Sequence, residues 1–156
     1  MNISVSMNSG LADQHKIISE IISGASHERL HVKPAPGKWS IHDNIAHLAR
    51  YNIVFQERMD TILNSELSKF PRYNADDDPE FPSWQQKSTD DLIDSISAER
   101  EKIFEKVKSY SENELARIGV HPKFGNLTIK NWLEFFLLHE AHHIFTMFRL
   151  KHDVDL

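Results

Sequence analysis

The chain has 156 residues, of which 40% are hydrophobic and 26% charged, and its formal net charge is −5. These values are typical of a single globular domain, here residues 1–156, that is long enough to build a core without disulfide or metal staples. Cysteine is absent, which excludes disulfides and thiolate ligands. Any nucleophilic thiol in the chemistry of this protein must therefore come from a small molecule.

The charge and apolar patterns also limit the partners. No run of Lys or Arg could follow a phosphate backbone, which argues against nucleic-acid binding. No apolar stretch reaches the roughly 20 residues that cross a bilayer, and the start MNISVSMNSG lacks the basic and apolar segments of a secretory signal. We expect a cytoplasmic protein that acts on a small molecule and has no membrane partner.

The first predicted helix begins at Ser9, whose hydroxyl can cap it, and continues through the segment IISEIISG. We expect this helix to end near Gly24 or to run on to about Arg29. The following segment, HVKPAPGK, contains two prolines and a glycine, which cannot continue a regular helix. It is predicted to be a connector.

A second helix is indicated by Ser40 and Asp43, whose spacing is that of a capping box. Helical periodicity continues to about Glu66. His47 lies within the broad apolar arc of this segment, so we expect it to face the bundle or its rim.

Residues 70–87 are predicted to form a long surface loop because they hold three prolines and a cluster of acidic residues. The run Asp76, Asp77 and Asp78 offers oxygen ligands for a hard cation. It lacks the glycine and the regular oxygen spacing of a calcium loop, however, which favours a solvated acidic turn.

The third helix is predicted to start at Ser88 or Thr89 and to run to about Tyr110. A short helical turn is expected to follow Ser111, because Glu114 occupies the capping-box position. The segment HPKFGNL, with its proline and glycine, then interrupts the helical pattern.

The last helix is predicted from Thr128, its cap, to about Leu150. We find no strand-like alternation of useful length anywhere in the chain. Four long amphipathic helices without strands predict an all-α fold, a four-helix bundle in which each helix buries one stripe against the others. Its first and third connections are long.

A histidine pair marks the last helix as the centre of a candidate site. His139 and His143 are four residues apart, so their side chains project in similar directions, about 40° apart and roughly 6 Å along the axis. A catalytic metal usually takes three protein ligands and keeps one position open, and His47 is the candidate third ligand. Three neutral imidazoles suit Zn(II) or Ni(II), whereas calcium and magnesium prefer oxygen.

Three further histidines receive less weight as ligands. His42 lies about 140° around the helix from His47, and His142 lies about 100° from His143, so both are expected to point elsewhere. His15 lies on the inward stripe of the first helix and is the substitute if His47 is not a ligand.

The segments PAPGKWSIHDNIAHLARYN and HPKFGNLTIKNWLEFFLLHEAHH resemble the DinB/YfiT-like superfamily of small four-helix bundle proteins. The positions that match the family pattern are Trp39, Ser40, His47, His139 and His143. The resemblance implies a Zn or Ni site formed by the three histidines, and a homodimer. Relatives often carry glutamine three residues after the last ligand, where this chain has Thr146, so a contact to a ligand or to the substrate is expected to differ.

Residues around the site are assigned roles as hypotheses. Asp43 and Asn44 lie one turn before His47 and could orient an imidazole. Tyr51 and Arg58 share the side of the helix that carries His47, and Arg58 could hold an anionic group of a substrate in two-point geometry. The alternative for Arg58 is an exposed ion pair.

The resemblance implies a metal-dependent enzyme, and its characterised relatives include transferases and isomerases that use a low-molecular-weight thiol such as bacillithiol or mycothiol. We therefore predict a thiol S-transferase that acts on a small electrophile, with a metal-bound thiol as co-substrate. One alternative is a metal-dependent hydrolase. The others are a non-catalytic, stress-associated module that binds a metal or an apolar ligand, and histidines that only pack.

Overall fold

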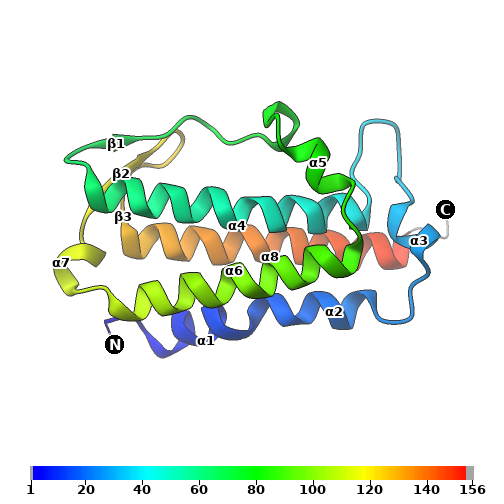
Figure 1. Cartoon of the computed structure of the whole chain (residues 1–156), viewed down its shortest axis with the longest axis horizontal. Coiled ribbons are helices and arrows are strands. Elements are labelled where there is room, and N and C mark those ends of the chain that lie inside the picture. The colour runs from blue at the N-terminus through cyan, green and yellow to red at the C-terminus, as the bar shows by residue number, and fades with distance from the viewer. Residues whose placement is uncertain (1, 154–156) are drawn as a thin grey trace.

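The computed structural model describes residues 2–153 and consists mainly of four rods packed side by side (Figure 1). The first and last rods run in one direction, and the second and third run in the opposite direction. Three rods are single long helices, and the first is interrupted by a 3-10 segment. The rods are α1 (Val5–Asp13), η1 (Gln14–Lys16) and α2 (Ile17–Ile22) together, α4 (Ile41–Asn64), α6 (Thr89–Ser109) and α8 (Ile129–Asp153). The predicted all-α four-helix bundle is thus confirmed, with a small sheet added at one end.

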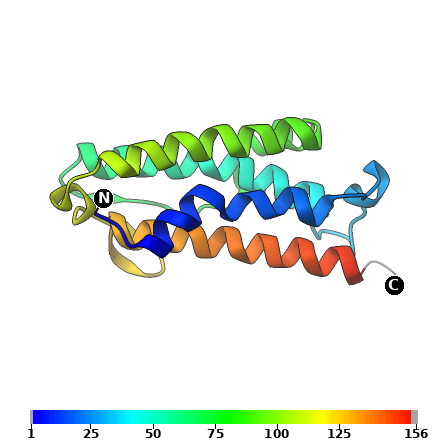
Figure 2. The ribbon, with the colours of Figure 1, turned by 90° about the horizontal axis from the view of Figure 1, so that it is seen from below.

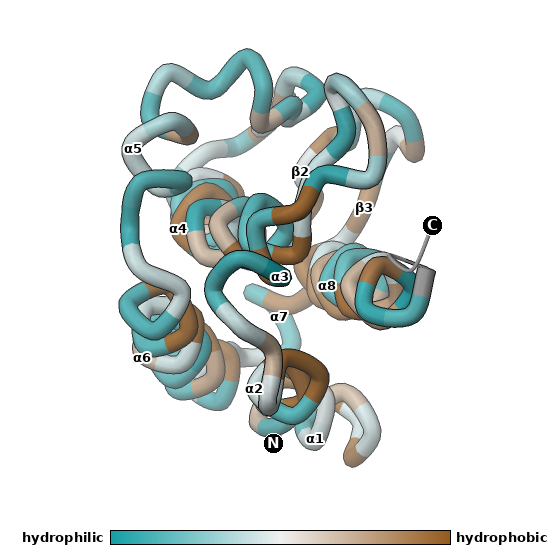
Figure 3. Tube along the Cα trace, turned by 90° about the vertical axis from the view of Figure 1, so that its right-hand side faces the viewer, coloured by the Kyte–Doolittle hydropathy of each residue, from teal (hydrophilic) through white to brown (hydrophobic). Residues whose placement is uncertain are grey.

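Seen end on, the hydrophobic segments of the four rods face one another (Figure 3). Figure 2 shows α1 and α2 covering the side of the bundle between α6 and α8. The largest side chains with less than 2% exposure include Trp132, Phe55, Leu11 and Ile96, which come from all four rods. Burial of such side chains against one another is the main force that holds amphipathic helices together.

The predicted start of α4 is confirmed in detail. The backbone N–H of Asp43 donates to Ser40 Oγ at 3.1 Å, and the N–H of Ser40 donates to Asp43 Oδ2 at 2.9 Å, which completes the capping box. A second capping box joins Ser111 and Glu114 at the start of α7 (Glu112–Leu115). Helix α4 ends at Asn64, two residues before the predicted end.

The prediction for the first helix was wrong at its start, and of its two predicted ends the one near Gly24 is confirmed. Helix α1 is capped by Ser4, whose Oγ accepts the N–H of Met7 at 3.2 Å, while Ser9 lies exposed within the helix. The helix starts early because Met7 is buried in the core. The rod ends before Gly24, which has a φ of 76°, and the next turn is a separate helix, α3 (His27–His31).

The sheet was not predicted. Strand β1 (Ser68–Lys69) pairs parallel to β2 (Ile118–His121), and β2 pairs antiparallel to β3 (Gly125–Thr128). Strands of two to four residues are too short to show alternation. A Cβ at Gly119 would lie 2.5 Å from Ile62 Cδ1, so only glycine lets the hairpin approach α4 this closely.

The loop between β1 and α6 is more ordered than predicted. It contains η2 (Ala75–Asp77) and α5 (Phe81–Gln85) and passes along α4 (Figure 1). Its acidic run is not simply solvated, because Asp78 accepts hydrogen bonds from Arg50 Nε at 2.8 Å and from the hydroxyl of Tyr73 at 3.0 Å. The loop is therefore fastened to α4 by charge-assisted hydrogen bonds.

None of the helices in residues 2–153 is both long and apolar enough to cross a membrane.

Candidate metal centre

Three histidines converge where α4 and α8 pack together. His47 comes from the second turn of α4, and His139 and His143 lie one turn apart on α8. One nitrogen of each ring lies within 4.8 Å of the other two, and Nε2 of His47 and Nε2 of His139 are 3.1 Å apart. In the described part of the chain, no other group of three potential ligands lies this close together.

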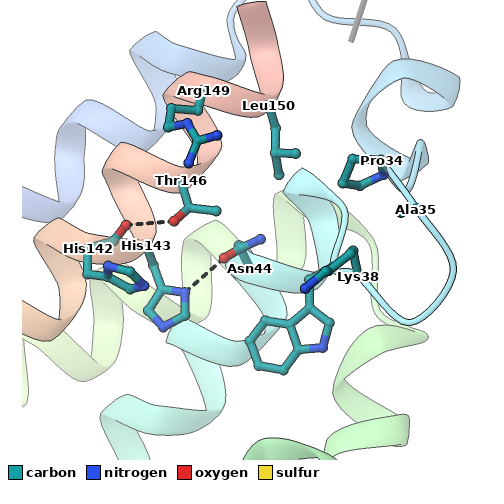
Figure 4. Close-up of a pocket in the computed structure, with 10 residues that line it drawn as sticks. Pro34, Ala35, Lys38, Asn44, His142, His143, Thr146, Arg149 and Leu150 are labelled. Carbon is teal, nitrogen blue, oxygen red and sulfur yellow. Dashed lines mark hydrogen bonds between the residues drawn. The ribbon is translucent and has the colours of Figure 1, made fainter. Parts of the chain in front are cut away.

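Asn44 fixes the orientation of one of these rings. Figure 4 shows the ring of His143, on α8, turned toward Asn44 on α4, and Nδ1 of His143 lies 2.8 Å from Asn44 Oδ1. The side-chain amide of Asn44 is held in this orientation, because its Nδ2 donates a hydrogen bond to the carbonyl oxygen of Ser40 at 2.8 Å that a flipped amide would lose. Nδ1 of His143 must therefore carry the proton and donate it, which leaves the lone pair on Nε2.

Burial keeps all three rings neutral. It lowers the pKa of His47 to about 2, that of His143 to about 3 and that of His139 to about 4. Desolvation is the largest cause in each case, and neighbouring histidines add to it. Neutral imidazole is the form that binds a metal, so protons do not compete for these nitrogens at neutral pH.

The three rings fit a borderline divalent ion. Zn–N bonds of 2.0–2.1 Å in tetrahedral geometry separate two ligand nitrogens by about 3.3 Å. The observed nitrogen separations, 3.1 Å for one pair and at most 4.8 Å for the others, require only a modest contraction. Nδ1 of His47 and Nδ1 of His139 are buried without a partner among the described residues, so only His143 has an orienting acceptor.

A cavity of about 830 Å³ opens on the side of the cluster where His47 and His139 lie. Its walls are rich in aromatic side chains from the segment before α4, the loop after β1, the β2–β3 turn and both helices. These side chains are Trp39, Tyr51, Tyr73, Phe124 and Phe135. A volume of this size accommodates a small organic molecule.

A second cavity of about 590 Å³ lies behind His143, on the side of Asn44 (Figure 4). Trp39, His142 and His143 line both cavities and so separate them. Because Nδ1 of His143 faces Asn44 on this side, the free Nε2 belongs to the larger cavity. We therefore take the larger cavity as the reaction side.

The hydrogen bonds of the Asp43 and Thr146 side chains go to groups outside the cluster. Asp43 is used in the capping box and accepts a hydrogen bond from Gln85 Nε2 at 2.7 Å, so it joins α4 to α5 instead of orienting an imidazole. Thr146 Oγ1 donates to the carbonyl oxygen of His142 at 2.9 Å and borders the second cavity (Figure 4). The orienting role foreseen for this turn of α4 falls to the adjacent Asn44.

Tyr51 and Arg58 line the larger cavity. The ring of Tyr51 lies 4.3 Å from that of His139, centroid to centroid. Burial raises the pKa of Tyr51 to about 12, against the opposing effect of Arg58. The phenol is therefore protonated at neutral pH and can act only as a hydrogen-bond donor or acceptor beside the cluster.

The other histidines considered from the sequence do not belong to the group of three potential ligands. His42 is occupied by Thr89 Oγ1 at 2.9 Å and the carbonyl oxygen of Gln85 at 3.0 Å. His142 is exposed, and its ring packs edge-on against that of His143. His15 is buried on η1 and is not part of the group of three.

Sequence reasoning missed two features near the cluster. His121, at the end of β2, also lines the larger cavity. The sequence signal that could have indicated it is the segment HPKFG, in which this histidine opens a turn that contains proline and glycine. Glu140 forms a fully buried ion pair with Arg100 of α6 and accepts from Gln14 Nε2 at 2.8 Å. The sequence alone did not indicate this partner of Glu140.

The comparisons with known proteins agree with this architecture. The model of the DinB superfamily matches residues 11–147. The uncharacterized protein YuaE of Bacillus subtilis is 27% identical over 146 residues, and the match covers 86% of this chain and 90% of YuaE.

Two solved Bacillus subtilis structures are similar in fold. YfiT, described as a probable metal-dependent hydrolase with an unusual four-helix bundle topology, has a TM-score of 0.82 at 15% identity and covers 99% of this chain and 91% of its own. The DinB-like protein YjoA has a TM-score of 0.61 at 17% identity and covers 97% of this chain and 93% of its own. On the evidence of the family match and the shared fold, the chain belongs to the DinB superfamily.

Proposed function

We propose that this protein is a metal-dependent enzyme that binds one divalent ion, Zn(II) or Ni(II), through His47, His139 and His143. The observation that carries the proposal is the convergence of three neutral imidazoles from two helices at the wall of a cavity. Three protein ligands leave a position for a reactant, which is the pattern of catalytic rather than structural sites.

The residues of the site would each have a limited task. The three imidazoles hold the ion, and Asn44 keeps the tautomer of His143 that offers Nε2. The aromatic wall excludes water and binds an apolar part of the substrate. When bound, the ion lowers the pKa of a thiol or a water at its open position and so supplies a nucleophile at neutral pH.

The leading reaction is transfer of a low-molecular-weight thiol to a small electrophile. No Asp or Glu occurs among the described residues that line the larger cavity, so a carboxylate base for activating water is not at hand. A thiol needs no such base, because a thiol that coordinates a metal is deprotonated outright. The absence of cysteine from the chain agrees with a thiol that is supplied from solution.

Hydrolysis is the second candidate, and the similarity to YfiT favours it. Water bound to zinc can reach a pKa of about 7 without a neighbouring base. The two reactions share the metal and differ only in the nucleophile.

The test compares the two nucleophiles on the same preparation. Zinc- and nickel-loaded protein is incubated with 1-chloro-2,4-dinitrobenzene and a panel of low-molecular-weight thiols, and separately with 4-nitrophenyl acetate without thiol. We expect dinitrophenyl conjugation that requires both metal and thiol, and that is lost in His47→Ala. Ester cleavage without conjugation would instead support the hydrolase, and metal binding without either reaction would support a non-catalytic module.

A further inference from the structure

Arg58 is a buried charge without a counter-ion. Only 7% of its surface is exposed, yet none of the carboxylates of the described residues forms an ion pair with it. Its Nη2 donates to the carbonyl oxygen of Pro71 at 3.0 Å, and its guanidinium carbon lies 5.4 Å from the centroid of the Phe70 ring. The alternative of an exposed ion pair is thereby removed. Burying an unpaired charge is costly, and such a charge in a cavity wall is a place for an anion.

The charged side chains that line the larger cavity are all positive among the described residues. Arg58, Arg72 and Lys123 line it, and no carboxylate does among the described residues, although the chain as a whole has a net charge of −5. Cationic groups around a concave, partly dry surface reinforce one another and raise the local concentration of anions. The arrangement is therefore opposite to what the composition alone would lead one to expect.

His121 adds a neutral donor to the same wall. Its Nδ1 accepts the backbone N–H groups of Lys123 at 3.1 Å and of Phe124 at 3.2 Å, so its proton lies on Nε2. Burial, with the charges of Arg58 and Lys123, lowers the pKa of His121 and keeps the ring neutral. A ring held in this tautomer can donate one hydrogen bond to an oxyanion.

The aromatic ring of Phe135 lies next to both His121 and the metal ligand His139. Phe135 lies 5.0 Å from His121 and 6.0 Å from His139 between ring centroids. Arg58 is near enough to His139, His121 and Tyr51 to affect the pKa of each. A ligand can thus contact the cations at one end and the histidine cluster at the other.

We propose that the substrate of this site is an oxyanion, a small molecule whose carboxylate or phosphate binds Arg58, with Lys123, Arg72 and His121 Nε2–H around it. The apolar body of the substrate lies against the aromatic wall, and its reacting end faces the histidine cluster. This inference rests on the proposed function for its reacting end only. The anion-binding groups belong to the protein itself and do not require the metal.

The experiment measures binding of benzoate and of its uncharged analogue benzamide by ligand-observed NMR, to metal-free and to zinc-loaded protein. We expect benzoate to bind both forms at least tenfold more tightly than benzamide. Arg58→Gln should weaken benzoate about tenfold, the loss of one charge-assisted hydrogen bond, and leave the zinc content unchanged. Lys102→Gln removes the same charge from the exposed side of α6 and is the matched control.

A second variant covers the case in which Arg58→Gln does not fold. Arg72 and Lys123 are both exposed, so the double variant Arg72→Gln/Lys123→Gln leaves the core intact and should weaken benzoate severalfold. Equal binding of benzoate and benzamide would overturn the proposal. So would benzoate binding that requires zinc and is unaffected by these variants, although the metal site itself would then stand.

Discussion

Replacing Asn44 tests how the protein prepares a ligand for the metal. In Asn44→Ala, His143 loses the acceptor that lies 2.8 Å from its Nδ1, while all three metal ligands remain. Loss of such an outer hydrogen bond typically costs 10- to 100-fold in metal affinity, which corresponds to about 1.4–2.7 kcal/mol. The reason is that His143 can then place its proton on either nitrogen and can rotate. Competition for zinc with a chromophoric chelator measures the change directly.

The chain offers a closely matched control for this variant. Asn52 lies two turns farther along α4, is equally buried, and its Nδ2 donates to the carbonyl oxygen of Leu48 at 2.8 Å, as Asn44 Nδ2 does to Ser40. Asn52→Ala removes the same side chain without touching a histidine, so it should lower stability but not zinc affinity. If the two variants had the same zinc affinity, the orienting role of Asn44 would be refuted.

Three further predictions concern stability and assembly. Glu140→Leu leaves Arg100 buried and unpaired and should lower the free energy of unfolding in urea by about 3–5 kcal/mol. Adding Arg100→Met in a double variant should restore most of this loss. A double variant whose loss equals the sum of the two single losses would contradict this. Burial lowers the pKa of His15 to about 4, so the unfolded chain takes up a proton that the folded one excludes. Stability should therefore fall as pH drops from 6.5 to 4, by up to about 3 kcal/mol from this residue, and His15→Asn should lose correspondingly less over that range. The homodimer implied by family resemblance stays a prediction. We expect it to use the outer face of α8, where the Phe145 side chain is 61% and the Phe148 side chain 49% exposed. Phe145→Glu should then sediment as a monomer, and a sedimentation coefficient equal to that of the wild type would exclude this face.

The starts of α4 and α7 were predictable because each has a strong local signal. Ser40 with Asp43, and Ser111 with Glu114, are capping boxes that act within one turn of the chain. The predicted start of the first helix was wrong because two serines, Ser4 and Ser9, could each cap it. Burial of Met7, a tertiary contact, decides between them.

The sheet and the internal ion pair depend on contacts that lie far apart in the sequence. Gly119 of β2 packs closely against Ile62 of α4, and the sequence around neither residue predicts this contact. Arg100 and Glu140 belong to different helices, and each alone has the pattern of an exposed charge on a helix. Long-range packing, rather than local preference, determines both features.

The histidine cluster was indicated by the spacing of His139 and His143, but the choice of His47 over His15 also used a family resemblance. Periodicity assigns both candidates to inward stripes of their helices, and it does not say which helices are neighbours at a given height. His121 and Arg58 line one cavity because the β2–β3 turn folds over α4. That arrangement is tertiary and could not be derived from the pattern of either segment.

Elemental analysis of untagged protein tests most directly whether the three histidines hold one metal ion together. We predict one equivalent of zinc or nickel in the wild type and in the control His152→Ala, which removes an exposed histidine from α8, the helix of His139 and His143. His47→Ala, His139→Ala and His143→Ala should each lose nearly all of it while remaining folded by circular dichroism. Equal metal content in all five proteins, or none in the wild type after reconstitution with zinc and nickel, would contradict the account.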